Sequence, residues 1–109
     1  QMAYNPTRFI GPVLLTTTNT NLKTFTYKSI VKSILTANTF NGPIAFNLYL
    51  VPAGQAPATS NRIFADVLLA ENTTKSTDTT LVINAGESLW ASANVTNGVS
   101  IMVSGVEVV

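Results

Sequence analysis

The stretch that decides the fold class is Leu89-Trp-Ala-Ser-Ala-Asn-Val95, followed by Thr96-Asn97-Gly98 and Val99-Ser-Ile-Met-Val-Ser-Gly-Val-Glu-Val-Val109. Apolar residues recur at every second position on both sides of the Asn-Gly pair, which is the period of a half-buried strand. Asn and Gly tolerate the positive φ angles of a type I′ turn, so the stretch predicts a β-hairpin. It therefore indicates a chain that is antiparallel β up to its last residues.

Alternation along this stretch also predicts which side chains face the core. Leu89 and the alanines that follow it share one face, so Trp90 should point outward. In the final strand, Val106 and Val108 have the opposite parity from the apolar positions before Ser104-Gly105. A β-bulge at Ser104-Gly105 would return both valines to the core face, and we predict one there.

Similar short runs recur upstream, separated by turn residues. The predicted strands before the hairpin are residues 13–17, 22–27, 29–37, 44–51, 62–70 and 79–83. A helix is the alternative for 29–37 and 62–70, although β-branched residues favour strands. Residues 52–61 and 71–78 are predicted to be loops from their composition. About eight short strands predict an all-β, antiparallel β-sandwich that is jelly-roll-like, with the strand order left open.

Two aromatic side chains, Tyr49 and Trp90, are predicted at outward positions of their strands. An exposed Tyr and Trp on a charge-poor sheet indicate a contact surface. Two alternatives remain open: the loop at residues 52–61 or the N-terminal arm covers them, or they stack on sugar rings. The residues predicted to face inward on the neighbouring strands are Ile44, Phe46, Leu48 and Leu50, then Ile63, Ala65, Val67 and Leu69.

The N-terminal residues 1–12 are predicted to form an extended arm, and residues 13–109 a single β-sandwich domain. Two prolines prevent a helix in the arm, and its large apolar side chains do not suit a solvated tail. The arm either folds back on its own sandwich or docks on a neighbouring subunit. The interface candidates are Tyr4, Arg8, Phe9, Ile10, Tyr49 and Trp90.

The composition of the 109 residues limits the chemistry. His and Cys are absent, which removes the commonest general base and the commonest metal ligands. The five acidic residues show no spacing that pairs two carboxylates for glycoside hydrolysis. We therefore expect no enzyme, with no catalytic residue, no cofactor and no metal.

The charge content indicates how this chain meets partners. Charged residues make up 10% of the sequence, against roughly 25% in ordinary domains, so we expect surface to be buried against other proteins. The net charge of +1 gives no reason to expect nucleic acid binding. Lys23, Lys28 and Lys32 predict a solvated strand face rather than a phosphate site. Residues 33–61 are uncharged but interrupted by Pro, Gly and Asn, so we expect no membrane contact.

A resemblance to a known group rests on three pieces of sequence. These are Ser33-Ile-Leu-Thr-Ala-Asn-Thr39, then Phe46-Asn-Leu-Tyr-Leu-Val-Pro-Ala-Gly54, then Ile83-Asn-Ala-Gly-Glu-Ser-Leu89 followed by Val103-Ser-Gly-Val-Glu-Val108. Their order resembles small β-sandwich virion proteins of tailed bacteriophages, over roughly residues 30–109. The resemblance implies a capsid decoration (cement) protein, or else a neck or tail component, and it carries over no active-site residue.

The same resemblance implies partners and a location. The partners would be the major capsid protein or other virion proteins, and the chain would be made in the host cytoplasm and sit on the capsid surface. A homo-oligomer is expected, first a trimer, because decoration often occupies three-fold positions, and second a dimer. A host-glycan-binding module is the alternative from a different functional class.

Overall fold

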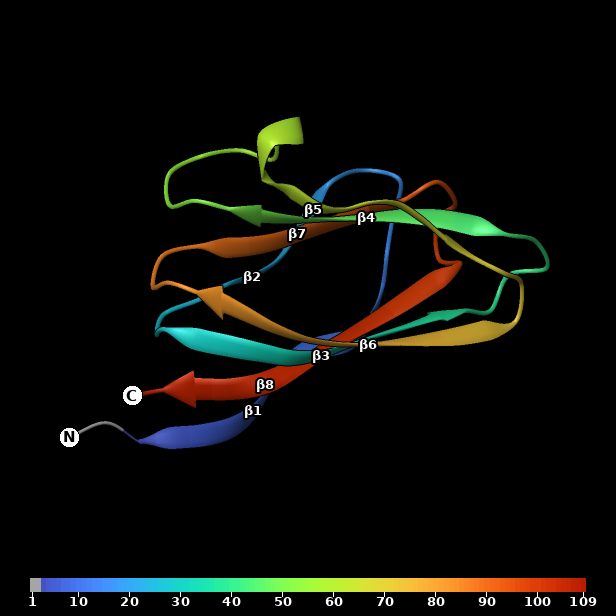
Figure 1. Cartoon of the computed structure of the whole chain (residues 1–109). Coiled ribbons are helices and arrows are strands. Elements are labelled where there is room, and N and C mark those ends of the chain that lie inside the picture. Colours follow the sequence, from blue (N-terminus) through green and yellow to red (C-terminus); the bar gives the residue numbers. More distant parts are fainter. Residues whose placement is uncertain (1–2) are drawn as a thin grey trace.

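Eight antiparallel strands form two four-stranded sheets in the computed structural model, which describes residues 3–109 (Figure 1). The elements are β1 (Tyr4–Leu14), β2 (Thr20–Thr24), β3 (Ser29–Asn38), β4 (Ile44–Val51), the 3-10 turn η1 (Thr59–Asn61), β5 (Arg62–Leu69), β6 (Thr73–Ile83), β7 (Ser88–Ala93) and β8 (Val99–Val108). The β1 sheet has the order β1-β8-β3-β6, and the β2 sheet has the order β2-β7-β4-β5. This is the strand order of a jelly roll, so the predicted fold class is confirmed.

The connections between the strands differ from the predicted ones. Six of the seven links between consecutive strands cross from one sheet to the other, and among the described strands only β4 and β5 are consecutive neighbours in one sheet. The hairpin predicted at Asn97-Gly98 is therefore wrong: β7 lies in the β2 sheet, whereas β8 lies in the β1 sheet. β4 and β5 form a hairpin instead, and a long connection at residues 52–61 joins them.

The local geometry explains why the Asn-Gly pair makes a crossover. Asn97 has a φ of 63°, but Gly98 is not among the residues with positive φ, as a type I′ turn would require. The N–H of Asn97 instead donates to the carbonyl oxygen of Leu15, at 2.9 Å. A Cβ atom at Gly98 would collide with the side chain of Ile44. Glycine at position 98 thus lets this connection pack closely against the tip of the Ile44 side chain.

The core lies between the two sheets and confirms most of the predicted inward positions. Its buried members are Phe9, Ile10, Leu15, Phe25, Val31, Ile34, Ile44, Phe46, Leu48, Leu69, Ile83, Leu89, Ala91, Ala93, Val99, Ile101 and Val103, with Leu50 partly buried against them. The segments that a helical period also fitted are strands β3 and β5. No helix within residues 3–109 is long and apolar enough to cross a membrane.

The inward set predicted for β5 is half wrong. Phe64 and Val67 pair with residues of β4 that are only two positions apart, so β5 contains an extra residue. This β-bulge includes Asp66, whose φ is 45°, and it shifts the alternation by one position. The bulge leaves Ile63 and Ala65 exposed, against the prediction, and keeps Val67 and Leu69 inward, as predicted.

The polar segment 71–78, predicted to be a loop, is largely part of a strand. β6 begins at Thr73 and pairs with β3 from Thr73 to Ile83. Threonine suits a strand as well as a polar surface. Because β6 is an edge strand, its outer positions need no apolar side chains.

β1 runs through the boundary that was predicted between residues 12 and 13. Tyr4 to Leu14 pair along β8, and Phe9 and Ile10 are buried in the core. The described part of the predicted arm is therefore an edge strand of its own sandwich, which is the first of the two alternatives above. Residues 1–2 of that arm lie outside the described residues.

The bulge predicted at Ser104-Gly105 lies in the neighbouring strands instead. Phe9 of β1 and Lys32 of β3 are the extra residues opposite this point, while β8 keeps its alternation. Val106 and Val108 therefore stay on the outer face of the β1 sheet rather than returning to the core. A Cβ atom at Gly105 would collide with the backbone of β3, so glycine allows the strands to approach closely here.

Candidate interaction surface

The six interface candidates lie in three different environments. Tyr4 is 62% exposed and Arg8 is exposed, and both lie on the outer face of the β1 sheet. Phe9 and Ile10 belong to the core, so they are not available to a partner. Tyr49 and Trp90 lie on the outer face of the β2 sheet, in adjacent register positions.

The outer face of the β2 sheet carries a row that crosses all four strands. Asn21 of β2 pairs with Trp90 of β7, Trp90 pairs with Tyr49 of β4, and Tyr49 pairs with Arg62 of β5. Tyr49 has the predicted outward parity, but it is only 9% exposed, so its predicted exposure is wrong. Trp90 is half-buried.

A segment of the chain explains this burial. Val51 shares the face of Tyr49 and is fully buried, although neither residue belongs to the core cluster between the sheets. The connection at residues 52–61, with η1, arches over the outer side of the β2 sheet beside β4 and β5 (Figure 1). Trp90 donates from Nε1 to Oγ of Ser88, at 2.8 Å. The burial of Tyr49 and the position of this connection agree with the alternative in which the loop covers the aromatic pair.

The polar groups beside this covered end bind one another. Oδ1 of Asn47 accepts from Nη1 of Arg62 at 3.2 Å and from the backbone N–H of Asp66 at 2.8 Å. Nδ2 of Asn47 donates to Oδ1 of Asp66 at 3.3 Å. Since a sugar site needs free polar groups beside an open aromatic face, this arrangement offers little to a glycan.

The outer face of the β1 sheet is open and more apolar. Its first row joins Tyr4 to Val108, next to Lys28, whose carbonyl accepts from the Val108 N–H at 2.8 Å. The second row, which we call the apolar row, consists of Pro6, Val106, Ile30 and Val82. The third row consists of Arg8, Ser104, Ser33 and Asp78, with Lys32 bulged beside Ser33.

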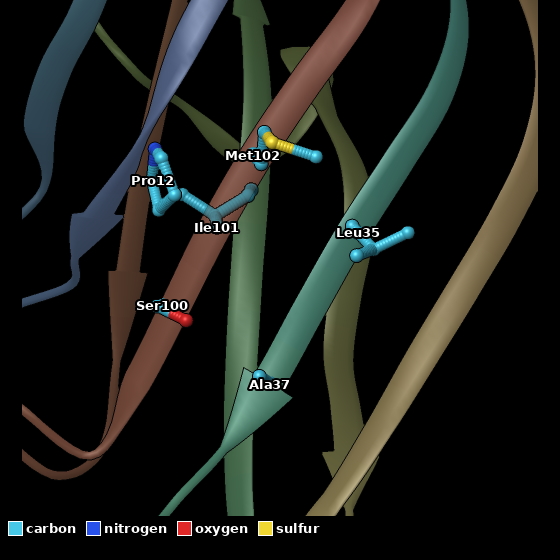
Figure 2. A pocket seen from close by; sticks show the side chains of 6 residues that line it. All are labelled: Pro12, Leu35, Ala37, Ser100, Ile101 and Met102. Carbon is cyan, nitrogen blue, oxygen red and sulfur yellow. The ribbon is translucent and has the colours of Figure 1, made fainter.

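A hollow continues the same face beyond the third row. It has a volume of about 130 Å³ and is lined by Pro12, Leu35, Ala37, Ser100, Ile101 and Met102. Figure 2 shows Leu35 and Ala37 on β3 beside Met102 and Ser100 on β8, with Pro12 reaching over from β1. Leu35 and Met102 are a cross-strand pair, so the hollow is a shallow apolar extension of the face rather than a channel into the core.

Sequence reasoning missed the apolar row as a surface feature. The signal was present, because Val106 and Val108 have the parity opposite to the core positions of β8. The prediction assigned that parity change to a bulge in β8, whereas the valines lie on the outside. Val82 is 47% exposed on the same face.

Neither the side chains nor the comparisons identify a reaction. Within residues 3–109, no group of three or more His, Cys, Asp or Glu side chains is placed to hold a metal ion. No family model, no curated protein and no solved structure matches this chain. The two outer faces of the sandwich are therefore the candidate functional surfaces.

Proposed function

We propose that this chain is a structural virion protein of a tailed bacteriophage that decorates the capsid and stabilises it by surface contacts. The resemblance given above is one support. The jelly-roll strand order is another, since such folds recur in viral capsid proteins, although a fold by itself does not fix a function.

The observation that carries the proposal is the open outer face of the β1 sheet. Val82 of the apolar row is at least two-fifths exposed, as are Tyr4 and Leu14 on the same face, which also carries the hollow. Contiguous exposed apolar surface in a small protein marks an interaction site. Such a face suits permanent contact with another protein.

The mechanism we propose is passive. Each copy buries apolar, weakly charged surface against the major capsid protein or another virion protein, on the capsid surface after synthesis in the host cytoplasm. A homo-oligomer, a trimer or else a dimer, would present several identical surfaces at once. Linked contacts multiply weak affinities, so a modest face on each copy is enough.

Co-sedimentation with emptied, undecorated capsids of the phage that encodes this chain tests the proposal. We expect the purified protein to pellet with these capsids, to saturate at a fixed ratio and to raise their resistance to heat. Binding to isolated tails but not to heads would assign the chain to the neck or tail. Absence from both would refute a structural role in the virion.

A host-glycan-binding module is the second candidate, and Trp90 is the observation that favours it. Its indole ring is partly exposed on the outer face of the β2 sheet, and aromatic faces can stack on sugar rings. A glycan array tests this candidate. Binding to a glycan that is lost in Trp90→Ala, together with no binding to capsids, would replace the decoration proposal.

A further inference from the structure

We propose that the outer face of the β1 sheet docks on a protein surface that is apolar at its centre and carries carboxylates at its rim. This inference deepens the proposed function and rests on it: the docking partner is the capsid shell, and its contact surface is acidic. The face that makes the contact and the charge of the partner both follow from the side chains of four strands and one turn.

The apolar row supplies the centre of the contact. Pro6, Val106, Ile30 and Val82 cross the sheet in register, from the β1 edge to the β6 edge. Tyr4 and Val108 extend this centre on one side. Because the row belongs to a regular sheet, its short side chains lie flush and suit a partner surface that is also flat.

Cations flank the apolar row on both sides. Lys28 immediately precedes the buried Ser29, so it alternates to the outer side next to Val108. Arg8 and the bulged Lys32 stand in the row on the other side, and all three cationic residues are exposed. Asp78 is the one acidic residue in these three rows. This face holds half of the six Lys and Arg residues of the chain.

That charge pattern argues against a second copy of the chain as the occupant. Consider two copies that meet face to face, with the two-fold axis parallel to the strands and between β8 and β3. Arg8 then lies across from Asp78 of the other copy, but the two Lys32 side chains come within one strand spacing of each other. A two-fold axis across the strands, at the apolar row, stacks Lys28 over Lys32. Like charges opposed in an interface cost several kcal/mol, whereas carboxylates on a partner satisfy all three cations.

The flush geometry argues against a membrane as the occupant. Interfacial amphipathic helices anchor in a bilayer by burying an apolar face roughly 5–10 Å into the boundary between headgroups and acyl chains. Proline, valine and isoleucine in the middle of a sheet cannot reach that depth. Three cations without a groove are also few for a phosphate backbone.

The size of the face suits one contact among several. Four strands at about 4.8 Å spacing and about ten residues of length give an area of roughly 600 Å². A standard protein interface buries about 800 Å² on each partner, so a single copy should bind weakly. Repetition over a shell compensates for this weakness.

The test compares two doubly charge-reversed proteins in the capsid co-sedimentation assay. In Lys28→Glu/Lys32→Glu the rim of the proposed face is reversed. In the matched control, Lys23→Glu/Lys75→Glu, the net charge changes equally, but neither lysine lies on this face: Lys23 is in β2, and Lys75 pairs with the buried Thr36 and points the other way. Circular dichroism confirms that both variants fold.

We expect the rim variant to bind capsids about tenfold more weakly or worse, and the control to stay within about twofold of the original protein. Raising the salt concentration should weaken binding of the original protein more than binding of the rim variant, since salt screens an attraction to carboxylates in the original protein and a repulsion in the variant. A third protein, Tyr4→Ser/Val82→Ser, should bind more weakly with an unchanged salt dependence.

Several outcomes would overturn the inference while leaving the proposed function intact. One is capsid binding by the rim variant at the level of the control. Another is a stable dimer in sedimentation equilibrium that Tyr4→Ser/Val82→Ser abolishes, which would make a second copy the occupant. A third is binding to vesicles of equimolar phosphatidylcholine and phosphatidylserine that is as strong as binding to capsids, which would make a membrane the occupant of the face. By contrast, if the original protein does not bind capsids at all, the proposed function itself is wrong.

Discussion

The two outer faces of this sandwich are built from similar residues and end up in opposite states. On the β2 sheet, Tyr49 and Val51 have outward parity, yet both are buried, on the side of the sheet over which the connection at residues 52–61 arches (Figure 1). On the β1 sheet, Tyr4 and Val82 have the same outward parity and are 62% and 47% exposed. The difference shows that strand parity decides only which side of a sheet a side chain takes. Whether that side is exposed to solvent depends on which other segments of the chain pack over it.

The covered face differs from the open one in its polar side chains as well. Asn47, Arg62 and Asp66 bind one another there, and Trp90 donates to Ser88. On the open face, no side-chain hydrogen bond joins Arg8 or Lys32 to Asp78 in the described contacts. On the covered face, the polar groups form hydrogen bonds with one another. On the open face, the exposed charges beside the apolar row remain available to a partner.

The sharpest way to break this comparison is to truncate one tyrosine on each face. Tyr49→Ala should lower the free energy of unfolding by about 3 kcal/mol, because it empties a buried aromatic site. Tyr4→Ala should change it by less than about 0.5 kcal/mol, because its side chain is largely in water already. Urea denaturation followed by circular dichroism measures both values. Equal losses in the two variants would mean that the loop does not cover Tyr49 as described.

A second change tests why the open face keeps its valines outside. Gly105→Ala should destabilise the chain by about 2 kcal/mol, because the new Cβ would meet the β3 backbone at the bulge. Gly54→Ala is the control for a glycine outside this contact, since a Cβ there has no neighbour within 4 Å, although its φ of 76° adds some strain. Thermal unfolding of the two variants compares them. A larger loss at Gly54 would contradict the close approach of β8 and β3.

The smallest expected effect concerns the hydrogen bond on the covered face. Ser88→Ala removes the acceptor of the Trp90 indole N–H and should cost about 1 kcal/mol. Trp90→Phe removes the donor, and combining the two changes should cost less than their sum, because each removes the same bond. A double-mutant cycle in urea measures this coupling. Strict additivity would show that the bond contributes nothing in solution.

Much of the fold could be predicted from local patterns, and the failures have a common cause. Alternation correctly placed Leu89, Ala91 and Ala93 in the core and Trp90 outside. It failed at β5, where an extra residue shifts the alternation by one position. At Ser104-Gly105 the predicted bulge was wrong, because the extra residues lie in β1 and β3 and β8 keeps its alternation. A bulge depends on how two strands pair, and no single strand records its partner's register.

The candidate surface was predictable only in part. Tyr4 and Arg8 were named from the sequence and lie on the open face, whereas Phe9 and Ile10 are core residues of the same strand. The bulge at Phe9 changes the alternation of β1, so Arg8 points outward and both residues after Arg8 are buried. Lys28 and Lys32 were predicted only to be solvated. Their place on either side of the apolar row depends on the pairing of β3 with β8 and β6.

By itself, the sequence determined the class of this protein: a charge-poor, all-β chain with strands of alternating polarity, because side-chain period and turn chemistry are local properties. Only the tertiary structure decided that Asn97-Gly98 crosses between sheets instead of closing a hairpin. It likewise decided that, among the described strands, a long loop joins the single pair of consecutive strands that are neighbours in one sheet. It also decided which outward face stays open. These outcomes depend on contacts between residues far apart in the chain, such as the contact of Gly98 with Ile44. Local sequence patterns hold no information about such contacts.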